Sequence, residues 1–533
     1  MHEPAAFGHR AASIRRGTYT DAGTRRDPGR PPWRRYRRRR PVRRCPTASR
    51  RTGPARPLGA GSGKEDQVAS DRATTLGALR RSDYRLRSVR EELRENLIAA
   101  IESGADLFPE IQGYDQTVLP QLQNAILSGH DVILLGERGQ AKSRLIRSLT
   151  GLLDEWIPTL AGAEIPENPF DPISEQGRQI IEELGDDAPI HWMHRDERYG
   201  EKLATPDITI ADLIGEVDPI KVAEGRYLSD QLTIHYGLIP RTNRGIFAIN
   251  ELPDLAERIQ VGLLNVMEER DIQIRGHKVR LALDVFIVAT ANPEDYTNRG
   301  RIITPLKDRY GSHIRTHYPR DIDEELEIVA QERVDVGAAG RELRVPRYME
   351  EIVAEVTRLA RRSPDVNQRS GVSVRASISN YESMTANALR RAVRLGEPEV
   401  APRISDLGFI RASLEGKVEL ETVEEGREDQ IIERLIQGAV VAVFNRHCSI
   451  SDMEPLIEAF KTGVTAEVGE GMASADYLTM LGSVEGLAEA VAGVAAGESA
   501  AEQASAIEFV LEGLHLNKRL NKDSIDGEAH YRG

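Results

Sequence analysis

A continuous apolar run followed by a helical pattern marks the most informative part of the chain. In Asp131–Leu135 the four residues that follow the aspartate are all apolar, which is typical of a short strand buried on both faces of a parallel sheet. After Ser143 the apolar residues recur at helical spacing, at positions 145, 146, 149, 152 and 153. The pattern predicts a buried strand, a tight loop and a helix whose apolar face packs behind that loop.

Two later apolar runs end in a polar side chain. Gly245–Asn250 leads to Glu251, and Asp284–Ala291 leads to Asn292, so each run is predicted to be a buried strand with a polar group at its end. Between these strands, apolar residues alternate on both sides of a turn at residues 275–278, which predicts a hairpin. Beyond residue 400, Ile431–Phe444 and Val484–Leu514 show helical periodicity only.

The loop after the first strand differs at one position from a phosphate-binding loop. The pattern G-x-x-x-x-G-K-[ST] requires glycine where this chain has Ala141, a change that adds a methyl group but removes no N–H donor. We therefore expect a nucleotide site in which Lys142 contacts the β- and γ-phosphates and Ser143 contacts Mg²⁺. The predicted nucleotide-binding residues are Gly136, Glu137, Arg138, Gly139, Gln140, Ala141, Lys142 and Ser143.

The charge of the chain is divided unevenly. The first 60 residues contain 17 Arg, no Lys and three acidic residues, a balance of +14, whereas all 533 residues together carry −13. The remaining sequence therefore carries −27. Such an acidic body argues against nucleic-acid binding, which requires a basic face.

The basic N-terminal segment is rich in Arg, Pro and Gly and nearly free of aliphatic residues, which predicts disorder. Three interpretations remain open: an arm for nucleic acid or acidic surfaces, a transit peptide, and translated upstream sequence from a wrongly assigned start. The prolines count against a transit helix. The chain has only Cys45 and Cys448 and no apolar run of membrane-spanning length, so we expect a cytoplasmic protein with no membrane partner.

A family resemblance becomes visible around the phosphate-binding loop. Gly113, the apolar helix after it, Ser128–His130 and a loop that ends in Ala141-Lys142 resemble the AAA+ ATPases of the MoxR and magnesium-chelatase group. In MoxR proteins alanine is usual before this lysine, so the resemblance accounts for Ala141. The resemblance covers roughly residues 113–394, about half of the chain.

Two inserted segments support the resemblance to this group over other AAA+ ATPases. Asp212–Gly215, the EGRY turn at residues 224–227 and Gly237–Pro240 resemble the hairpin inserted in helix 2 of this group. The hairpin predicted around residues 272–281 matches the group's pre-sensor insertion. The sequence has no GAFTGA-type loop, which counts against the enhancer-dependent transcription activators that share much of this core.

The resemblance implies an α/β fold, with an AAA+ P-loop NTPase core in which helices sandwich a parallel sheet. A helical lid and an additional C-terminal helical region are expected after the core. We place a disordered extension at residues 1–80, the core at 81–325, the lid at 326–400 and the C-terminal helical region at 401–533.

The resemblance also implies roles for four residues. Glu251 would be the Walker B glutamate that orients the attacking water, and Asn292 would be sensor 1. Arg309 would be the arginine finger that reaches the nucleotide of a neighbouring subunit, and Arg375 would be the sensor 2 arginine. Asn292 could instead cap the turn that follows it, and each arginine could form a simple surface ion pair.

Asn250 departs from the pattern of the group, which usually has aspartate at this position to hold a Mg²⁺-bound water. The amide keeps an acceptor oxygen but loses the charge, and a lost charge near a cation costs on the order of a few kcal/mol at an effective dielectric of ~20. We predict that metal affinity is reduced and that hydrolysis is slow. On charge alone, Asn250→Asp is expected to improve the use of Mg²⁺.

The function implied by the resemblance is that of a ring ATPase, most often a hexamer, which uses ATP and Mg²⁺ to remodel or activate a separate client or von Willebrand-type partner protein. Two alternatives remain. Gly237–Glu251 and Leu306–Ile314 look closer to the motor subunit of a metal chelatase, and Asn250 favours a nucleotide-bound regulator with little hydrolysis. His191 and His194 are spaced as a metal-binding pair, but no second ligand pair accompanies them.

Overall fold

The chain divides into two units, Met1–Ser70 and Asp71–Gly533, and all described residues belong to the second. The computed structural model describes residues 72–223, 231–268, 281–292, 301–334, 340–368, 370–420, 427–494, 497, 499–525 and 528–533. The EGRY turn and residues 272–280 of the hairpin predicted around residues 272–281 lie outside the described residues.

Five parallel strands form the central sheet of the core. Their order is β4 (Tyr199–Leu203), β7 (Gly245–Asn250), β8 (Val285–Ala291), β1 (Val132–Leu135) and β9 (Ser312–Arg315). Strand β1 pairs on one edge with β8 and on the other with β9. Because both edges and both faces of β1 are covered, its residues are apolar throughout.

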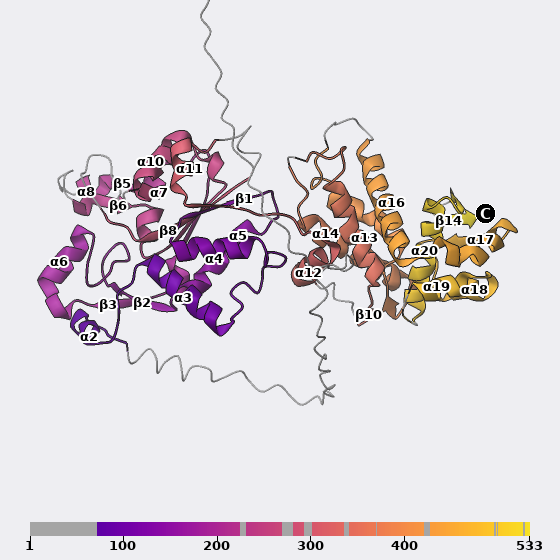
Figure 1. Cartoon of the computed structure of the whole chain (residues 1–533), viewed down its shortest axis with the longest axis horizontal. Helices are drawn as coiled ribbons and strands as arrows, with labels where there is room; N and C mark the ends of the chain where they lie inside the picture. The colour runs from indigo at the N-terminus through magenta and orange to yellow at the C-terminus, as the bar shows by residue number, and fades with distance from the viewer. Residues whose placement is uncertain are drawn as a thin grey trace, which may run out of the picture. The chain divides into compact units, whose positions relative to one another are not determined.

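Helices cover both faces of this sheet, above and below β1 and β8 in Figure 1. Val132 and Leu134 of β1 belong to one hydrophobic core and Ile133 to the other, as expected for alternating side chains. The first core is completed by α3 (Val89–Ser103), α4 (Val118–Ser128) and α5 (Lys142–Ser148). The second is completed by α7 (Ile210–Leu213), α9 (Leu238–Arg241), α10 (Glu257–Glu268) and α11 (Thr304–Arg309). The predicted α/β core with a parallel sheet between helices is confirmed.

Short elements surround the sheet. Strands β5 (Gly215–Val217) and β6 (Ile234–Tyr236) pair antiparallel where the sequence predicts the inserted hairpin, and α8 (Pro219–Ala223) lies between them in the chain. A second antiparallel pair consists of β2 (Trp156–Leu160) and β3 (Ile190–His194), and α6 (Glu175–Leu184) lies between these two strands in the chain.

The folded chain begins earlier than the sequence predicts. Helix α2 (Leu76–Arg80) is capped by the side chain of Thr75, and Leu76 is buried against Leu160 and Ala188. The backbone N–H of Leu76 donates to the carbonyl of Ala188 at 2.9 Å. The extension predicted for residues 1–80 is therefore too long at its C-terminal end, because a single helical turn is too short to show periodicity.

The helical region that follows the core has a large hydrophobic core of its own. It contains buried residues of helices on both sides of residue 400, the predicted boundary between lid and C-terminal region. The helices are α12 (Ile322–Glu332), α13 (Arg347–Ala360), α14 (Arg375–Leu395), α15 (Arg411–Leu414), α16 (Arg427–His447), α17 (Glu454–Lys461), α18 (Ser474–Ser483), α19 (Leu487–Gly493) and α20 (Ala500–Leu516).

Five short strands accompany these helices, although the sequence shows helical patterns only. Strands β10 (Glu342–Leu343) and β11 (Glu399–Val400) pair in parallel. Strands β12 (Thr465–Val468), β14 (Glu528–Arg532) and β13 (Asn521–Ile525) form an antiparallel sheet in that order. In the part of the chain that the structure describes, no helix is both long enough and apolar enough to cross a membrane.

A buried ion pair joins helix α3 to Arg198, the residue just before β4. Arg198 donates to both carboxylate oxygens of Glu92 on α3, at 2.7 and 2.6 Å, and its side chain is 1% exposed. Arg198→Ala is expected to lower the free energy of unfolding by about 3–5 kcal/mol, because Glu92 would remain buried without its partner. Urea unfolding followed by circular dichroism measures this loss.

The control for this prediction is Arg80→Ala, which removes an exposed pair with Asp186 and is expected to cost about 0–1 kcal/mol. Equal losses in the two variants would show that burial does not determine the contribution of the Arg198–Glu92 pair.

Candidate functional site

The loop between β1 and α5 has the backbone of a phosphate-binding loop. Gly139 and Ala141 both have positive φ, 75° and 52°, and Lys142 is the first residue of the helix. A Cβ atom on Gly139 would lie 1.9 Å from the hydroxyl of Ser373, so only glycine fits there. Ala141 adopts a left-handed conformation at a cost on the order of 1 kcal/mol, which explains why the pattern prefers glycine at this position.

Lys142 joins three sequence motifs in one hydrogen-bonded chain. Its buried ammonium donates to the carbonyl oxygens of Gly136 and Glu137, the latter at 2.9 Å, and to Oδ1 of Asn292 at 2.7 Å. The amide of Asn292 in turn donates to Oε2 of Glu251 at 2.8 Å. The ends of β1, β7 and β8 thus bring the loop lysine, the strand-end asparagine and the strand-end glutamate together.

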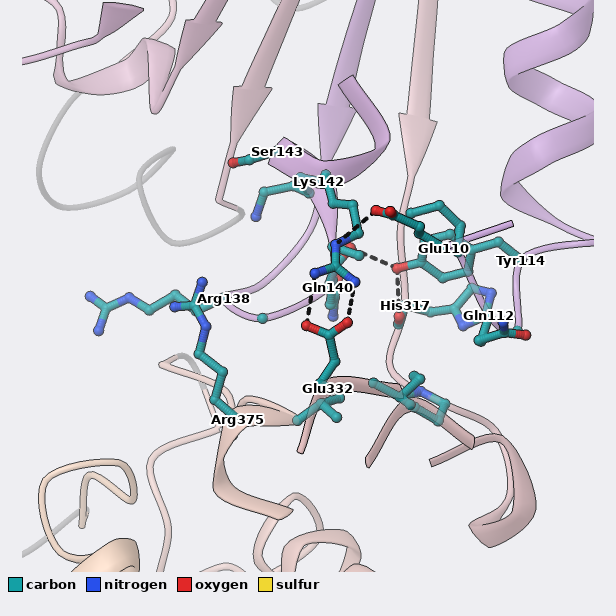
Figure 2. Close-up of a pocket in the computed structure, with 18 of the residues that line it drawn as sticks. Glu110, Gln112, Tyr114, Arg138, Gln140, Lys142, Ser143, His317, Glu332 and Arg375 are labelled. Carbon is teal, nitrogen blue, oxygen red and sulfur yellow. Dashed lines mark hydrogen bonds and ion pairs between the residues drawn. The ribbon is translucent and has the colours of Figure 1, made fainter. Parts of the chain in front are cut away.

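A cavity of about 600 Å³ lies in front of this loop. Lys142, Ser143, Glu251 and Asn292 line it from the core, and Arg375 lines it from the first residue of α14. Figure 2 shows Arg375 pointing from the helical region toward the loop that carries Lys142 and Ser143. Among the described residues Arg375 makes no ion pair, so its guanidinium is available to a ligand in the cavity.

The other loop residues either support the backbone of the loop or line the cavity. The side-chain oxygen of Gln140 accepts hydrogen bonds from the N–H of Glu137 at 3.1 Å and from the hydroxyl of Thr316 at 2.6 Å. Tyr114 donates to the carbonyl of Gln140 at 2.8 Å, as drawn in Figure 2. Arg138 is half-exposed and lies 3.5 Å from Glu419. Arg138, Gly139, Gln140 and Ala141 all line the cavity, with Lys142 and Ser143.

Asn250 lies at the end of β7 beside a carboxylate that the sequence analysis did not identify. Its amide nitrogen donates to Glu201 on β4, and its own oxygen is buried with no hydrogen-bond partner among the described residues. Burial raises the pKa of Glu201, but hydrogen bonds from Arg147 and Tyr199 outweigh that effect and hold the pKa below its usual value.

Arg309 is placed apart from these groups. It lies near the end of α11, it is not among the residues that line the cavity, and it pairs with Glu268 on α10 with Nε and Oε2 3.0 Å apart. Its guanidinium also donates to the carbonyl of Pro305 at 2.9 Å. The structure therefore contains the surface ion pair that the sequence left open for this residue. A role of Arg309 in the cavity of its own subunit is not supported.

Two further cavity-lining residues, Arg144 and Glu332, form an arginine clamp that the sequence pattern does not reveal. Arg144, which follows Ser143, makes a two-point ion pair with Glu332 of α12, with Nη2 and Oε2 2.7 Å apart. The hydrogen bond that Arg144 donates to Glu332 raises the pKa of the guanidinium. Glu332 lies 188 positions away in sequence, so no local pattern predicts the contact.

Among the described residues, His191 and His194 are not part of a cluster that could hold a metal ion. His194 lies 3.2 Å from Asp196 and accepts a hydrogen bond from the Asp196 N–H, which caps a short turn. Within the described ranges, no group of three or more His, Cys, Asp or Glu side chains is arranged to hold a metal ion.

Comparison with known proteins gives one family profile and a set of relatives. A profile described as "Sigma-54 interaction domain" matches residues 223–306. The magnesium-chelatase subunit ChlI of Nostoc sp. is 29% identical over 236 residues, 42% of this chain and 58% of that protein. The chloroplastic subunit ChlI-1 of Arabidopsis thaliana is 28% identical over 236 residues, 42% of this chain and 51% of that protein. The matched segment thus spans little more than half the length of these relatives.

A solved structure is also similar in outline. A complex of the BchI and BchD subunits of magnesium chelatase is 18% identical, with 61% of this chain and 98% of that chain covered and a TM-score of 0.31.

Proposed function

This chain belongs to the AAA+ ATPases of the MoxR and magnesium-chelatase group, and we propose that it binds ATP with Mg²⁺ and hydrolyses the nucleotide. The observation that carries the proposal is the hydrogen-bonded chain from Lys142 through Asn292 to Glu251 in the wall of one cavity. A phosphate-binding lysine, a polar strand end and a carboxylate within reach of one ligand are the parts that phosphoryl transfer to water requires.

Ser143, which lines the cavity, and Asn250, at the end of β7, are side chains of the kind that holds a magnesium ion. Ser143 offers a hydroxyl, and Asn250 offers a buried amide oxygen with no partner among the described residues. Oxygen donors of this kind are those that Mg²⁺ prefers. When bound, the ion would supply positive charge to the β- and γ-phosphates.

The remaining steps belong to the side chains of the protein. Lys142 would exchange its contacts with the loop carbonyls for contacts with phosphate oxygens, and the N–H groups of the loop would hold the same phosphates. Glu251 would orient the attacking water and accept its hydrogen bond, while Asn292 holds the carboxylate in place. Arg375 would offset charge on the γ-phosphate from the side of the helical region.

We also propose that the chain assembles into a ring in which Arg309 acts on the nucleotide of a neighbouring subunit. A cation outside the cavity of its own subunit is suited to the cavity of a neighbour, as the resemblance implies. We propose that the ring, most often a hexamer in this group, acts on a separate partner protein, either a client that it remodels or a von Willebrand-type subunit.

A metal-chelatase motor is the second candidate, favoured by the ChlI relatives. Two assays separate the candidates: capture of bound proteins from the native cell extract in ATP and in a non-hydrolysable analogue, and metal insertion into a tetrapyrrole by the chain with its captured partners. ATP-dependent capture without metal insertion would favour remodelling, and insertion would favour the chelatase.

Glu251→Gln tests the proposed chemistry. The variant is expected to bind ATP with the affinity of the wild type, because no phosphate contact is assigned to Glu251. Release of phosphate should fall by about 10²–10⁴-fold, the contribution that a general base makes. The measurement is phosphate release beside the amount of unhydrolysed ATP retained after gel filtration. Wild-type turnover in Glu251→Gln would remove the catalytic role from this residue.

A further inference from the structure

The end of β7 carries a neutral amide, and a carboxylate stands beside it on the neighbouring strand. Strands β4 and β7 are parallel, with Glu201 opposite Ala248 and Leu203 opposite Asn250. Residues two apart on a strand share one face, so Glu201 and Asn250 project to the same side of the sheet. The amide nitrogen of Asn250 donates to Oε1 of Glu201 across this short diagonal.

Glu201 is fixed from three directions. Arg147 donates to both of its oxygens, with distances of 2.9 and 3.0 Å, and the hydroxyl of Tyr199 donates at 3.1 Å. A carboxylate held in a two-point arginine pair accepts hydrogen bonds and has none to donate. Therefore only the nitrogen end of the Asn250 amide can face Glu201, and the oxygen end must face away from it. That oxygen is the buried atom without a partner among the described residues.

The Arg147–Glu201 ion pair starts one helical turn from Ser143, one of the expected metal ligands. Arg147 follows Ser143 by four residues on α5, so the two side chains lie on one face of the helix. Both line the cavity. Arg147 on α5 and Glu201 on β4 thus connect the helix that carries Ser143 to the Asn250 amide.

We propose that Glu201 is a positioning residue for the metal site, one that fixes the Asn250 amide so that its oxygen faces the ion. The inference rests on the proposed function and deepens it. In this chain, Asn250 would bind the ion through a correctly oriented amide dipole and not through a negative charge. The neighbouring strand supplies the carboxylate that sets this orientation, and Arg147 balances its charge.

This arrangement reverses the effect expected of Asn250→Asp. A carboxylate at position 250 would lie in hydrogen-bond contact with Glu201 and would have no proton to donate, so like charges would meet. The double variant Glu201→Gln/Asn250→Asp exchanges the two groups, because the amide of a glutamine at position 201 can donate to an aspartate at position 250. We expect each single variant to weaken metal binding and the double variant to recover it.

The test measures binding and not turnover. The full chain is titrated with a fluorescent, non-hydrolysable ATP analogue in MgCl₂ and again in EDTA. The Kd in EDTA divided by the Kd in MgCl₂ gives the contribution of the metal to binding. Glu201→Gln and Asn250→Asp are each expected to lower this ratio about 10-fold, the smaller end of the range for residues that orient metal ligands. The Kd in EDTA should stay unchanged, and the double variant should return most of the ratio. Glu216→Gln, an exposed carboxylate on β5, is the matched control and should behave as wild type.

The outcomes distinguish the positioning role of Glu201 from the proposed binding of ATP. A wild-type ratio in Glu201→Gln, or a higher ratio in Asn250→Asp alone, would overturn the positioning role while leaving ATP binding in place. The positioning role would also be overturned if the double variant lost as much metal-dependent binding as the two single variants together. The exchange of the two groups would then have restored nothing. Failure of the wild type to bind the analogue in either buffer would instead reject the proposed function.

Discussion

Lys142→Ala is expected to abolish ATP binding at concentrations that saturate the wild type. The ammonium already has three acceptors around it, the carbonyls of Gly136 and Glu137 and the amide oxygen of Asn292, so it is held at the centre of the loop. A charged hydrogen bond contributes about 1.5–3 kcal/mol, and the loss of two phosphate contacts therefore weakens binding by more than 100-fold, on the order of 3–6 kcal/mol. Among the described residues, Lys142 is the one lysine that lines the cavity.

Titration with a fluorescent ATP analogue measures this loss, and the thermal unfolding midpoint shows whether the variant is folded. Lys461→Ala is the control, because Lys461 forms an exposed ion pair with Glu458 on α17. It should bind the analogue as the wild type does. Undiminished binding by a folded Lys142→Ala variant would remove the nucleotide site from this loop.

Arg309→Ala is expected to retain ATP binding and to lose hydrolysis by about 10³–10⁵-fold, the contribution of an arginine finger where one has been measured. Binding persists because Arg309 lies outside the cavity of its own subunit. Hydrolysis fails because the charge that grows on the neighbour's γ-phosphate would lack a cation. Phosphate release and analogue binding, measured on the same preparation, separate the two effects.

Glu268→Gln distinguishes the finger from a structural ion pair. The variant removes the partner of Arg309 and keeps the arginine. If the ion pair is all that matters, the two variants should lose the same activity. The account predicts that Glu268→Gln hydrolyses ATP at a rate close to wild type, since an exposed pair contributes little to stability.

The parts of the site that were predictable from sequence are those carried by local runs. Strands β1, β7 and β8 are continuous apolar segments that end in a loop or a polar side chain, so Lys142, Glu251 and Asn292 could be assigned roles before any contact was known. The family resemblance then implied that these strands belong to one parallel sheet. The hydrogen-bonded chain among the three side chains is the three-dimensional consequence of that arrangement.

The parts that were missed depend on contacts between distant segments. Strand β4 has no fully buried residue, so nothing in its sequence marks Glu201 as a neighbour of Asn250. Charge alone therefore suggested that Asn250→Asp would help the metal, and only the contact across the sheet reverses that expectation. The shared core of α13 and α16 was hidden for a similar reason: helical periodicity shows which face of a helix is apolar, but it does not show which other helix covers it.

The measurement that tests the central claim most directly is the ATPase activity of mixtures of two inactive variants, Lys142→Ala and Arg309→Ala. The first lacks a working pocket but carries an intact finger, and the second carries an intact pocket but no finger. The account predicts that mixed assemblies regain partial activity, that the activity depends on the mixing ratio, and that it is greatest when both variants are abundant. If no ratio restores hydrolysis while differently labelled subunits demonstrably assemble together, the site is not shared between subunits and Arg309 is a structural ion-pair residue.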